Sequence, residues 1–255
     1  MAKLIFLGTG AALPTSERTN TSLAVLLDAD RKGLLIDCGG DGFRSMIRYN
    51  VGLDSFSDLF ITHAHIDHVG SLPSLLESLR LGGRTAPLHI WGLPQVLEVV
   101  HGLIHVFDFE LKLDQWSFAV SFSEVKPGEA ITLAGIPAHT GGMDHAVPAL
   151  GLRLDLPDGA LAYTSDTQPN PNIAVLGQDA RTLITECTFL SAYEAPARSS
   201  RHLTAHEAGV LARDCHAERL VLVHGGGAPD DLRTEAGQAF NGQIIVPSDG
   251  DSLDI

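Results

Sequence analysis

One short segment of the chain concentrates residues that bind metal ions. Residues 63–68 read HAHIDH, which places three of the twelve histidines and one aspartate within six positions. Neutral imidazole and carboxylate groups are ligands that Zn²⁺ and similar divalent ions accept. Four candidate ligands are too many for one catalytic zinc, which needs an open coordination position. The spacing therefore predicts two adjacent metal ions, completed by ligands from elsewhere in the chain.

The residues on either side of this segment predict how it is positioned. An apolar run at 59–62 precedes it, and leucines with helical spacing follow it at 72–81. We expect a strand at 59–62, whose alternation turns His63 and His65 to one face while Asp67 and His68 approach from the turn beyond. This setting argues against a chance cluster on a solvated loop. The lack of a cysteine in the segment argues against a structural zinc site.

The rest of the chain reads as two similar halves of alternating strands and helices. Strands are expected at 3–7, 22–27, 33–37, 150–156, 160–163, 182–185, 220–223 and 243–246, with strand-like alternation at 116–136. Helices are expected at 72–81, 94–106, 204–215 and 230–240. Hairpin turns are predicted over 28–32 and 157–159, and Thr204 with Glu207 predicts a capping box. Because no linker separates the halves, we expect residues 1–255 to form one α/β domain.

Composition narrows the class of protein. The 255 residues include 17 Lys and Arg against 31 Asp and Glu, a net charge of −14, which disfavours a broad basic face for nucleic acid. Three cysteines are too few for a disulfide framework, so a reducing, cytoplasmic setting is expected. No apolar run reaches the length of about 18 residues that a membrane span needs.

Several motifs carry a resemblance to a known family. The HAHIDH segment resembles the first metal motif of the metallo-β-lactamase superfamily, and further motifs are similar to its ribonuclease Z-like branch, in that branch's order. They are FLGTG at 6–10, PT at 14–15, RTNTS at 18–22, IDCG at 36–39, HAVPALGLR at 145–153, YTSDT at 163–167, ECTF at 186–189, HLTA at 202–205, LVLVH at 220–224 and SDG at 248–250. Ser165 stands where the branch usually has glycine. The matches run from residue 5 to residue 250.

The resemblance implies a fold, a metal centre and a reaction. The fold would be a four-layer αβ/βα sandwich, the metallo-β-lactamase fold. The centre would hold two divalent ions, with zinc expected and manganese or iron as alternatives, and a hydroxide between them would be the nucleophile. Asp67 and His202 would have catalytic roles, His202 as the proton donor to the leaving oxygen. The implied ligands are His63, His65 and His145 for one ion, Asp67, His68 and His224 for the other, and Asp166 as the bridge.

Four details stay open at this point. His139 competes with His145 for the third-ligand position, although Pro148 and the strand expected from Leu150 favour His145. Asp37 and Asp249 are candidates for orienting ligand histidines. The glycines at 225–227 could present backbone amides to an anionic substrate or form a plain turn. His202 could also be an ordinary surface histidine.

The substrate is expected to be small. Ribonuclease Z enzymes carry a long basic arm between the second and third metal motifs, and here the interval 81–138 holds only a Gly82-Gly83-Arg84 turn and ordinary elements. We therefore expect a phosphodiesterase acting on a small anionic phosphodiester or related ester. The alternatives are a transfer-RNA 3′-processing endoribonuclease without a long arm, a lactonase or arylsulfatase-type hydrolase, and a metal-retaining binding protein without turnover. The resemblance also suggests a homodimer.

Overall fold

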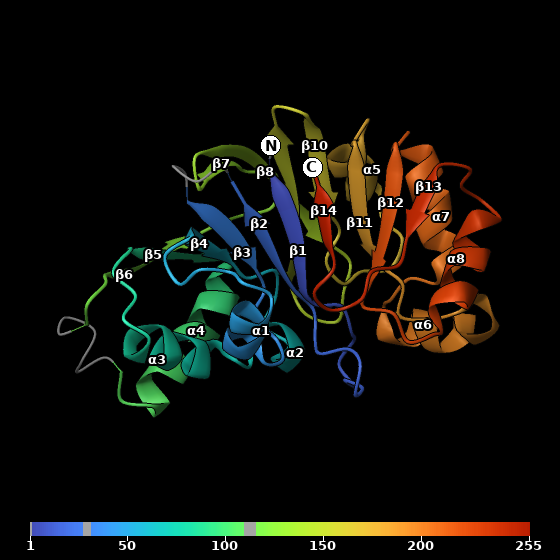
Figure 1. Ribbon diagram of the computed structural model, residues 1–255. Helices are drawn as coiled ribbons and strands as arrows, with labels where there is room; N and C mark the ends of the chain where they lie inside the picture. Colours follow the sequence, from blue (N-terminus) through green and yellow to red (C-terminus); the bar gives the residue numbers. More distant parts are fainter. Residues whose placement is uncertain (1, 28–31, 110–115) are drawn as a thin grey trace.

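The computed structural model describes residues 2–27, 32–109 and 116–255, and in them two seven-stranded sheets face each other. The first sheet has the order β14-β1-β2-β3-β4-β5-β6 and the second the order β13-β12-β11-β10-β9-β8-β7. Helices cover the outer side of each sheet (Figure 1), which gives the four layers of the metallo-β-lactamase fold. The expected fold class is confirmed.

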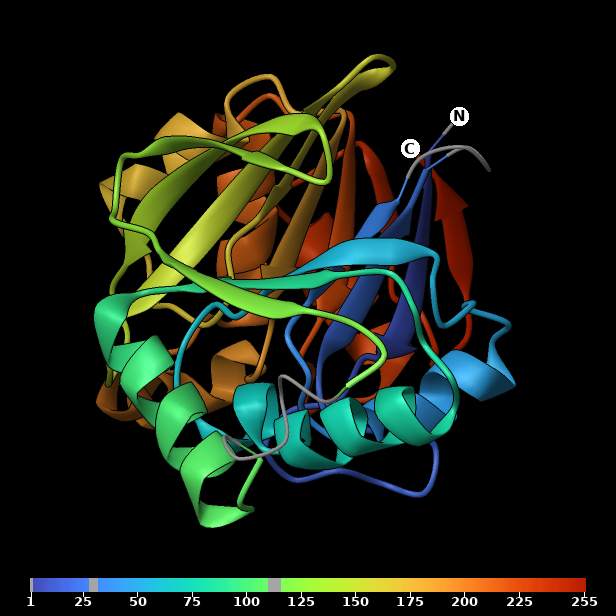
Figure 2. The same cartoon turned by 90° about the vertical axis from the view of Figure 1, so that its left-hand side faces the viewer.

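The elements of the first half build the first sheet and its helices. Strand β14, from the end of the chain, pairs with β1, so both termini lie side by side (Figure 1). Helices α3 and α4 lie next to each other along this sheet (Figure 2). The bounds are β1 Lys3–Gly8, β2 Ser22–Leu26, β3 Gly33–Ile36, α1 Gly42–Arg48, β4 Phe56–Phe60, α2 Ile66–Val69, α3 Leu72–Leu81, β5 Leu88–Gly92, α4 Pro94–Val106, β6 Val120–Glu124 and β14 Ser252–Asp254.

The second half builds the second sheet. Strands β10 to β13 are parallel to one another, whereas β7, β8, β9 and β10 pair antiparallel. The bounds are β7 Ala130–Leu133, β8 Ile136–Met143, β9 Ala149–Leu156, β10 Gly159–Tyr163, α5 Pro171–Gly177, β11 Thr182–Glu186, the 3-10 turn Ser191–Tyr193, α6 Glu194–Ser200, α7 Ala205–Asp214, β12 Arg219–Val223, α8 Pro229–Gly237 and β13 Gln243–Ile245.

One hydrophobic core fills the space between the sheets. It joins apolar side chains of the first sheet, such as Leu4 and Leu59, to side chains of the second, such as Leu152 and Val221, all fully buried. Strands with both faces covered need near-continuous apolar sequences, which is how β3 and β12 read. A core shared by both halves agrees with the expectation of one domain over 1–255, which stays a prediction.

Most expected elements match the structure within a few residues. The helix expected at 94–106 is α4, and the capping box of Thr204 and Glu207 opens α7. The expected hairpins pair as predicted, although the turn residues 28–31 lie outside the described part of the chain. The sequence reading missed α1, β5, β8, α5, α6 and β14. None of the described helices is long and apolar enough to cross a membrane.

The strand expected to carry the first histidines ends two residues earlier than predicted. Strand β4 ends at Phe60, and residues 61–65 are irregular, so the prediction of a strand over 59–62 was wrong at its end. The physical reason is a change of partner. The backbone N–H of Thr62 donates to the side chain of Asp37 at 2.8 Å instead of to a neighbouring strand. Pairing therefore stops before the HAHIDH segment, which becomes a rigid loop rather than part of the sheet.

Candidate metal centre

The candidate site lies at one edge of both sheets, beyond the carboxyl ends of β4, β10 and β12. The loop after β4 carries the HAHIDH segment, the loop after β10 carries Asp166, and His224 follows β12 directly. This edge lies at the bottom of the molecule in Figure 1, near α2. In open α/β sheets, ligands bind beyond the carboxyl ends of the strands. The topology therefore brings together residues that are up to 161 positions apart, as His63 and His224 are.

Three histidines form the first group of converging nitrogen atoms. His65 Nδ1 lies 3.2 Å from His63 Nε2 and 3.0 Å from His145 Nε2. Two atoms that bind one Zn²⁺ at about 2.0–2.1 Å in tetrahedral geometry lie about 3.3 Å apart. His63 and His145 are buried, whereas His65 is half-buried. The group therefore has the spacing of three ligands around one ion, with room for a fourth on the open side.

Two carboxylates and two histidines form the second group. His224 Nε2 lies 3.2 Å from Asp67 Oδ2 and 3.3 Å from Asp166 Oδ2. His68 Nε2 lies 3.6 Å from Asp67 Oδ2 and 3.4 Å from Asp166 Oδ2. All four side chains are buried, and their candidate ligand atoms lie within 4.8 Å of one another. These distances also suit a single divalent ion.

Asp166 connects the two groups. Its Oδ2 atom lies 3.8 Å from His63 Nε2 and 4.0 Å from His145 Nε2, in addition to its contacts with the second group. One carboxylate therefore faces both sets of nitrogen atoms. The position is the one that a bridging ligand between two ions would take.

Hydrogen bonds to Nδ1 fix the ring orientation of three candidate ligand histidines, His68, His145 and His224. His68 Nδ1 lies 2.8 Å from Asp37 Oδ2, and His224 Nδ1 lies 2.9 Å from Thr188 Oγ1. His145 Nδ1 lies 3.2 Å from the carbonyl oxygen of Arg201. When Nδ1 donates outward, the lone pair of Nε2 points inward, as a metal ligand requires.

Unpartnered atoms show that a cation fits between these side chains. His68 Nε2 and Asp166 Oδ1 are buried and have no hydrogen-bond partner among the described residues. Burial and the neighbouring imidazoles hold the pKa of His63 well below its usual range, which keeps it neutral. Although burial alone would raise it, the facing His224 and His68 hold the pKa of Asp166 well below its usual range. Imidazole nitrogens around an ionised carboxylate are a donor set that suits a divalent ion.

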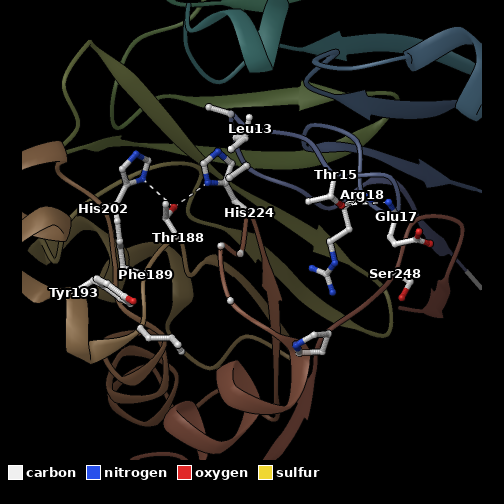
Figure 3. A pocket seen from close by; sticks show the side chains of 17 residues that line it. Leu13, Thr15, Glu17, Arg18, Thr188, Phe189, Tyr193, His202, His224 and Ser248 are labelled. Atoms are coloured by element: carbon white, nitrogen blue, oxygen red, sulfur yellow. Dashed lines mark hydrogen bonds between the residues drawn. The ribbon is translucent and has the colours of Figure 1, made fainter.

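His202 lies beside the two groups rather than within them. Its Nδ1 atom is 2.7 Å from Glu186 Oε1, and its ring stacks on His224 with centroids 5.5 Å apart. Burial would lower the pKa of His202, but the hydrogen bond and charge of Glu186 raise it above its ordinary value. Both His202 and His224 line an open pocket of about 930 Å³ (Figure 3). His202 is therefore not a free surface histidine.

The competing third-ligand candidate lies elsewhere. His139 is on strand β8, where its Nε2 atom lies 3.3 Å from the exposed carboxylate of Asp155. His145 stands in the loop after the same strand and joins the first group. The sequence analysis had not predicted the paired strand β8, which contains His139.

The two aspartates proposed to orient ligand histidines, Asp37 and Asp249, have different roles. Asp37 does contact a candidate ligand, His68, from a left-handed backbone conformation with φ 60°. Asp249 contacts none. It accepts hydrogen bonds from the backbone N–H groups of Thr9 and Thr19, so it fixes the loop after β1.

Two motif residues to which the sequence analysis gave no role complete the surroundings. Thr188 Oγ1 contacts Glu186 Oε2 at 2.6 Å, His202 at 3.2 Å and His224 at 2.9 Å, and so links the proton-donor candidate to a metal-ligand candidate (Figure 3). Ser165 has φ 58°, the left-handed region that favours glycine, which explains why glycine is usual at this position of the motif. The ECTF motif at 186–189, just beyond the buried strand β11, was the available signal for Thr188.

Comparisons with known proteins agree with this geometry. The family model described as anti-Pycsar protein Apyc1 matches residues 2–240. A ribonuclease Z of Myxococcus xanthus is 30% identical, in an alignment that covers 100% of this chain and 98% of the relative. The metallo-β-lactamase fold protein YhfI of Bacillus subtilis is 21% identical, with a TM-score of 0.83 and 100% of both chains covered. The short form of human tRNase Z is 22% identical, with a TM-score of 0.79 and 99% of both chains covered.

These matches assign the family and the class of chemistry. The chain is similar over its full length to a protein named ribonuclease Z. It also has two groups of candidate metal ligands at the carboxyl edge of its sheets. The chain is a metal-dependent hydrolase that belongs to the ribonuclease Z-like branch of the metallo-β-lactamase superfamily and, within it, to the family described as anti-Pycsar protein Apyc1.

Proposed function

We propose that the protein hydrolyses phosphodiester bonds with two divalent ions, zinc being the expected metal. His63, His65 and His145 would hold one ion, Asp67, His68 and His224 the other, and Asp166 would lie between them. The observation that carries the proposal is the position of Asp166 Oδ2, which faces nitrogen atoms of both groups at 3.3–4.0 Å. When bound, such an ion pair supplies a nucleophile at neutral pH and neutralises charge on the attacked phosphate.

The chain's own side chains would orient the reaction and move its protons. Asp67 Oδ2 lies 3.2 Å from His224 Nε2, so its carboxylate is turned toward the second group. His202 lines the pocket beside the metal-ligand candidates, and its Nδ1 atom contacts Glu186. Its other ring nitrogen, Nε2, would give a proton to the leaving oxygen. A histidine whose pKa is raised by a buried carboxylate suits a general acid near neutral pH.

We propose a small phosphodiester as the substrate. The alignment to the Myxococcus relative runs over 309 positions, whereas this chain has 255 residues, so that relative contains segments without a counterpart here. A net charge of −14 also disfavours the many phosphate contacts that hold a large RNA. The pocket beside the ligand groups, about 930 Å³, is of a size that suits a small ligand.

The second candidate is cleavage of RNA at a 3′ end. The names of the relatives support it better than they support a small substrate, because the Myxococcus relative is named ribonuclease Z and the human structure is a tRNase Z. For RNA, binding would rely on local contacts near the metal centre rather than on a broad basic face.

One panel of measurements tests the function. Metal analysis of protein purified without chelator should give two metal ions per chain. The loaded protein should hydrolyse bis(p-nitrophenyl) phosphate faster than the matching monoester, lactone and sulfate esters, and precursor transfer RNA is assayed beside them. Asp67→Ala should abolish turnover, whereas His139→Ala, which removes an exposed histidine on β8, should leave it unchanged. Rapid cleavage of the RNA alone would favour the second candidate, and no hydrolysis of any substrate would reject the enzyme.

A further inference from the structure

The terminal nitrogen atoms of one arginine in the pocket have no hydrogen-bond partner among the described residues. The Nη1 and Nη2 atoms of Arg18 are buried and make no hydrogen bond to any described residue. Its side chain lines the same pocket as His202 and His224 and extends into the space between His224 and Ser248 (Figure 3). A guanidinium carries five donors and stays charged at every physiological pH. Burying such a group without a counter-charge is unfavourable, so its position calls for an anionic partner.

The loop that carries Arg18 is fixed to the metal centre. Thr15 Oγ1 accepts hydrogen bonds from the backbone N–H groups of Glu17 and Arg18, which closes the turn. The next residue, Thr19, donates its N–H to Asp249 Oδ2 at 2.7 Å.

The other oxygen of Asp249 accepts from Thr9 N–H at 2.9 Å, and the carbonyl oxygen of Thr9 accepts from His224 N–H at 2.9 Å. A short chain of hydrogen bonds therefore links the Arg18 loop to a candidate metal ligand. The backbone that carries Arg18 is therefore fixed relative to the candidate ligand His224.

The pocket offers little else that would bind an anion. Among the described residues that line it, Arg18 is the only lysine or arginine, and most of the others are apolar, glycine or hydroxyl-bearing. The glycines at 225–227 line the pocket as well, so an anion there would meet exposed backbone and no opposing bulky side chain. The one acidic lining residue, Glu17, is exposed.

We propose that Arg18 is a substrate-binding residue that holds a phosphate oxygen of the ligand next to the metal centre. The identity of the anion rests on the proposed phosphodiester hydrolysis, whereas the need for an anion rests on the unpartnered guanidinium. Arginine suits this task because its planar fork can donate two parallel hydrogen bonds to one phosphate group.

The test compares Arg18→Gln and Arg18→Lys with Arg44→Gln, which removes an exposed arginine on α1 outside the pocket. Binding of inorganic phosphate to the metal-loaded proteins is measured by calorimetry, with metal content determined for each. Arg18→Gln should weaken phosphate binding about 10-fold to 100-fold, as for loss of a charged hydrogen bond. Arg18→Lys should recover part of it, and Arg44→Gln should match the unaltered protein.

Kinetics supply a second readout. Arg18→Gln should raise KM for bis(p-nitrophenyl) phosphate and leave KM for the uncharged ester p-nitrophenyl acetate unchanged. Phosphate affinity within twofold of the unaltered protein in Arg18→Gln would overturn the proposal. So would loss of bound metal in both Arg18 variants, because that would make Arg18 a structural residue. If the protein hydrolysed no phosphodiester yet lost phosphate affinity in Arg18→Gln alone, the anion site would stand and the proposed function would fail.

Discussion

Asp37 Oδ2 lies 2.8 Å from Nδ1 of His68, and both side chains are completely buried. The same carboxylate accepts the backbone N–H of Thr62 and so ends the sheet pairing of β4. One residue thus stops a strand and orients a metal-ligand candidate in the loop that follows. Asp37 adopts φ 60° to do both.

Asp37→Asn should weaken metal binding without unfolding the chain. Asparagine tolerates the left-handed backbone region, and its amide oxygen can still accept one hydrogen bond. Removal of the negative charge lowers the basicity of His68, and changes of this kind typically cost about 10-fold to 100-fold in metal affinity. Competition with a chromophoric chelator measures the change. Asp155→Asn, on the exposed end of β9, is the control, and equal affinities of the two variants would contradict the role of Asp37.

Glu186→Gln should shift the pH profile of hydrolysis. The pKa of His202 is raised by Glu186, so its protonated form persists to higher pH, and its contribution is lost as pH rises through that raised pKa. Without the charge of Glu186 the pKa falls, and the alkaline limb of kcat/KM should move to lower pH. Glu218→Gln, at an exposed carboxylate, should keep the original limb. Superimposable profiles for the two variants would count against His202 as proton donor.

Gly39→Ala should disrupt the site, because a Cβ at this position would lie 1.7 Å from the carbonyl oxygen of Asp67. The backbone of the HAHIDH loop would have to move, so we expect loss of bound metal and a lower melting temperature. Gly102→Ala is the matched control in α4, where nothing lies within 4 Å of the added carbon. That variant should gain about 0.5–1 kcal/mol of unfolding free energy, since alanine is the better helix former. Metal retained at the original level in Gly39→Ala would refute the prediction.

Arg84→Met should destabilise the fold far from the site. This arginine is fully buried, donates to the carbonyl oxygens of Phe56 and Pro87 at 2.7 and 2.8 Å, and stacks on the Phe56 ring. Each carbonyl left unsatisfied costs about 1–3 kcal/mol, so we expect a loss of roughly 3 kcal/mol in urea unfolding. Arg80→Met, at a half-exposed surface ion pair, should change stability by less than about 1 kcal/mol. Similar effects of the two substitutions would show that the buried donors do not matter.

Much of the architecture could be read from the sequence because it depends on local patterns. Neighbouring residues alone determine the apolar runs with the period of strands and helices. The same is true of the turn at 157–159 and of the capping box of α7. The strand β8 was missed because its sequence, with Pro137, Gly141 and Gly142, has a weak local preference for strand, and its pairing with β7 and β9 makes it regular. Tertiary pairing overrides weak local preference there.

The same division holds for the site. The types and spacing of residues in HAHIDH by themselves predicted a pair of metal ions, because four ligand groups in six positions exceed what one catalytic ion needs. Only the tertiary structure decided that His145 rather than His139 joins them and that Thr188 links His202 to His224. It also buries the Nη atoms of Arg18 without a hydrogen-bond partner in the described part of the chain. Those facts depend on where separate loops meet at the edge of two sheets, and a distance between loops is not encoded in the residues of either loop alone.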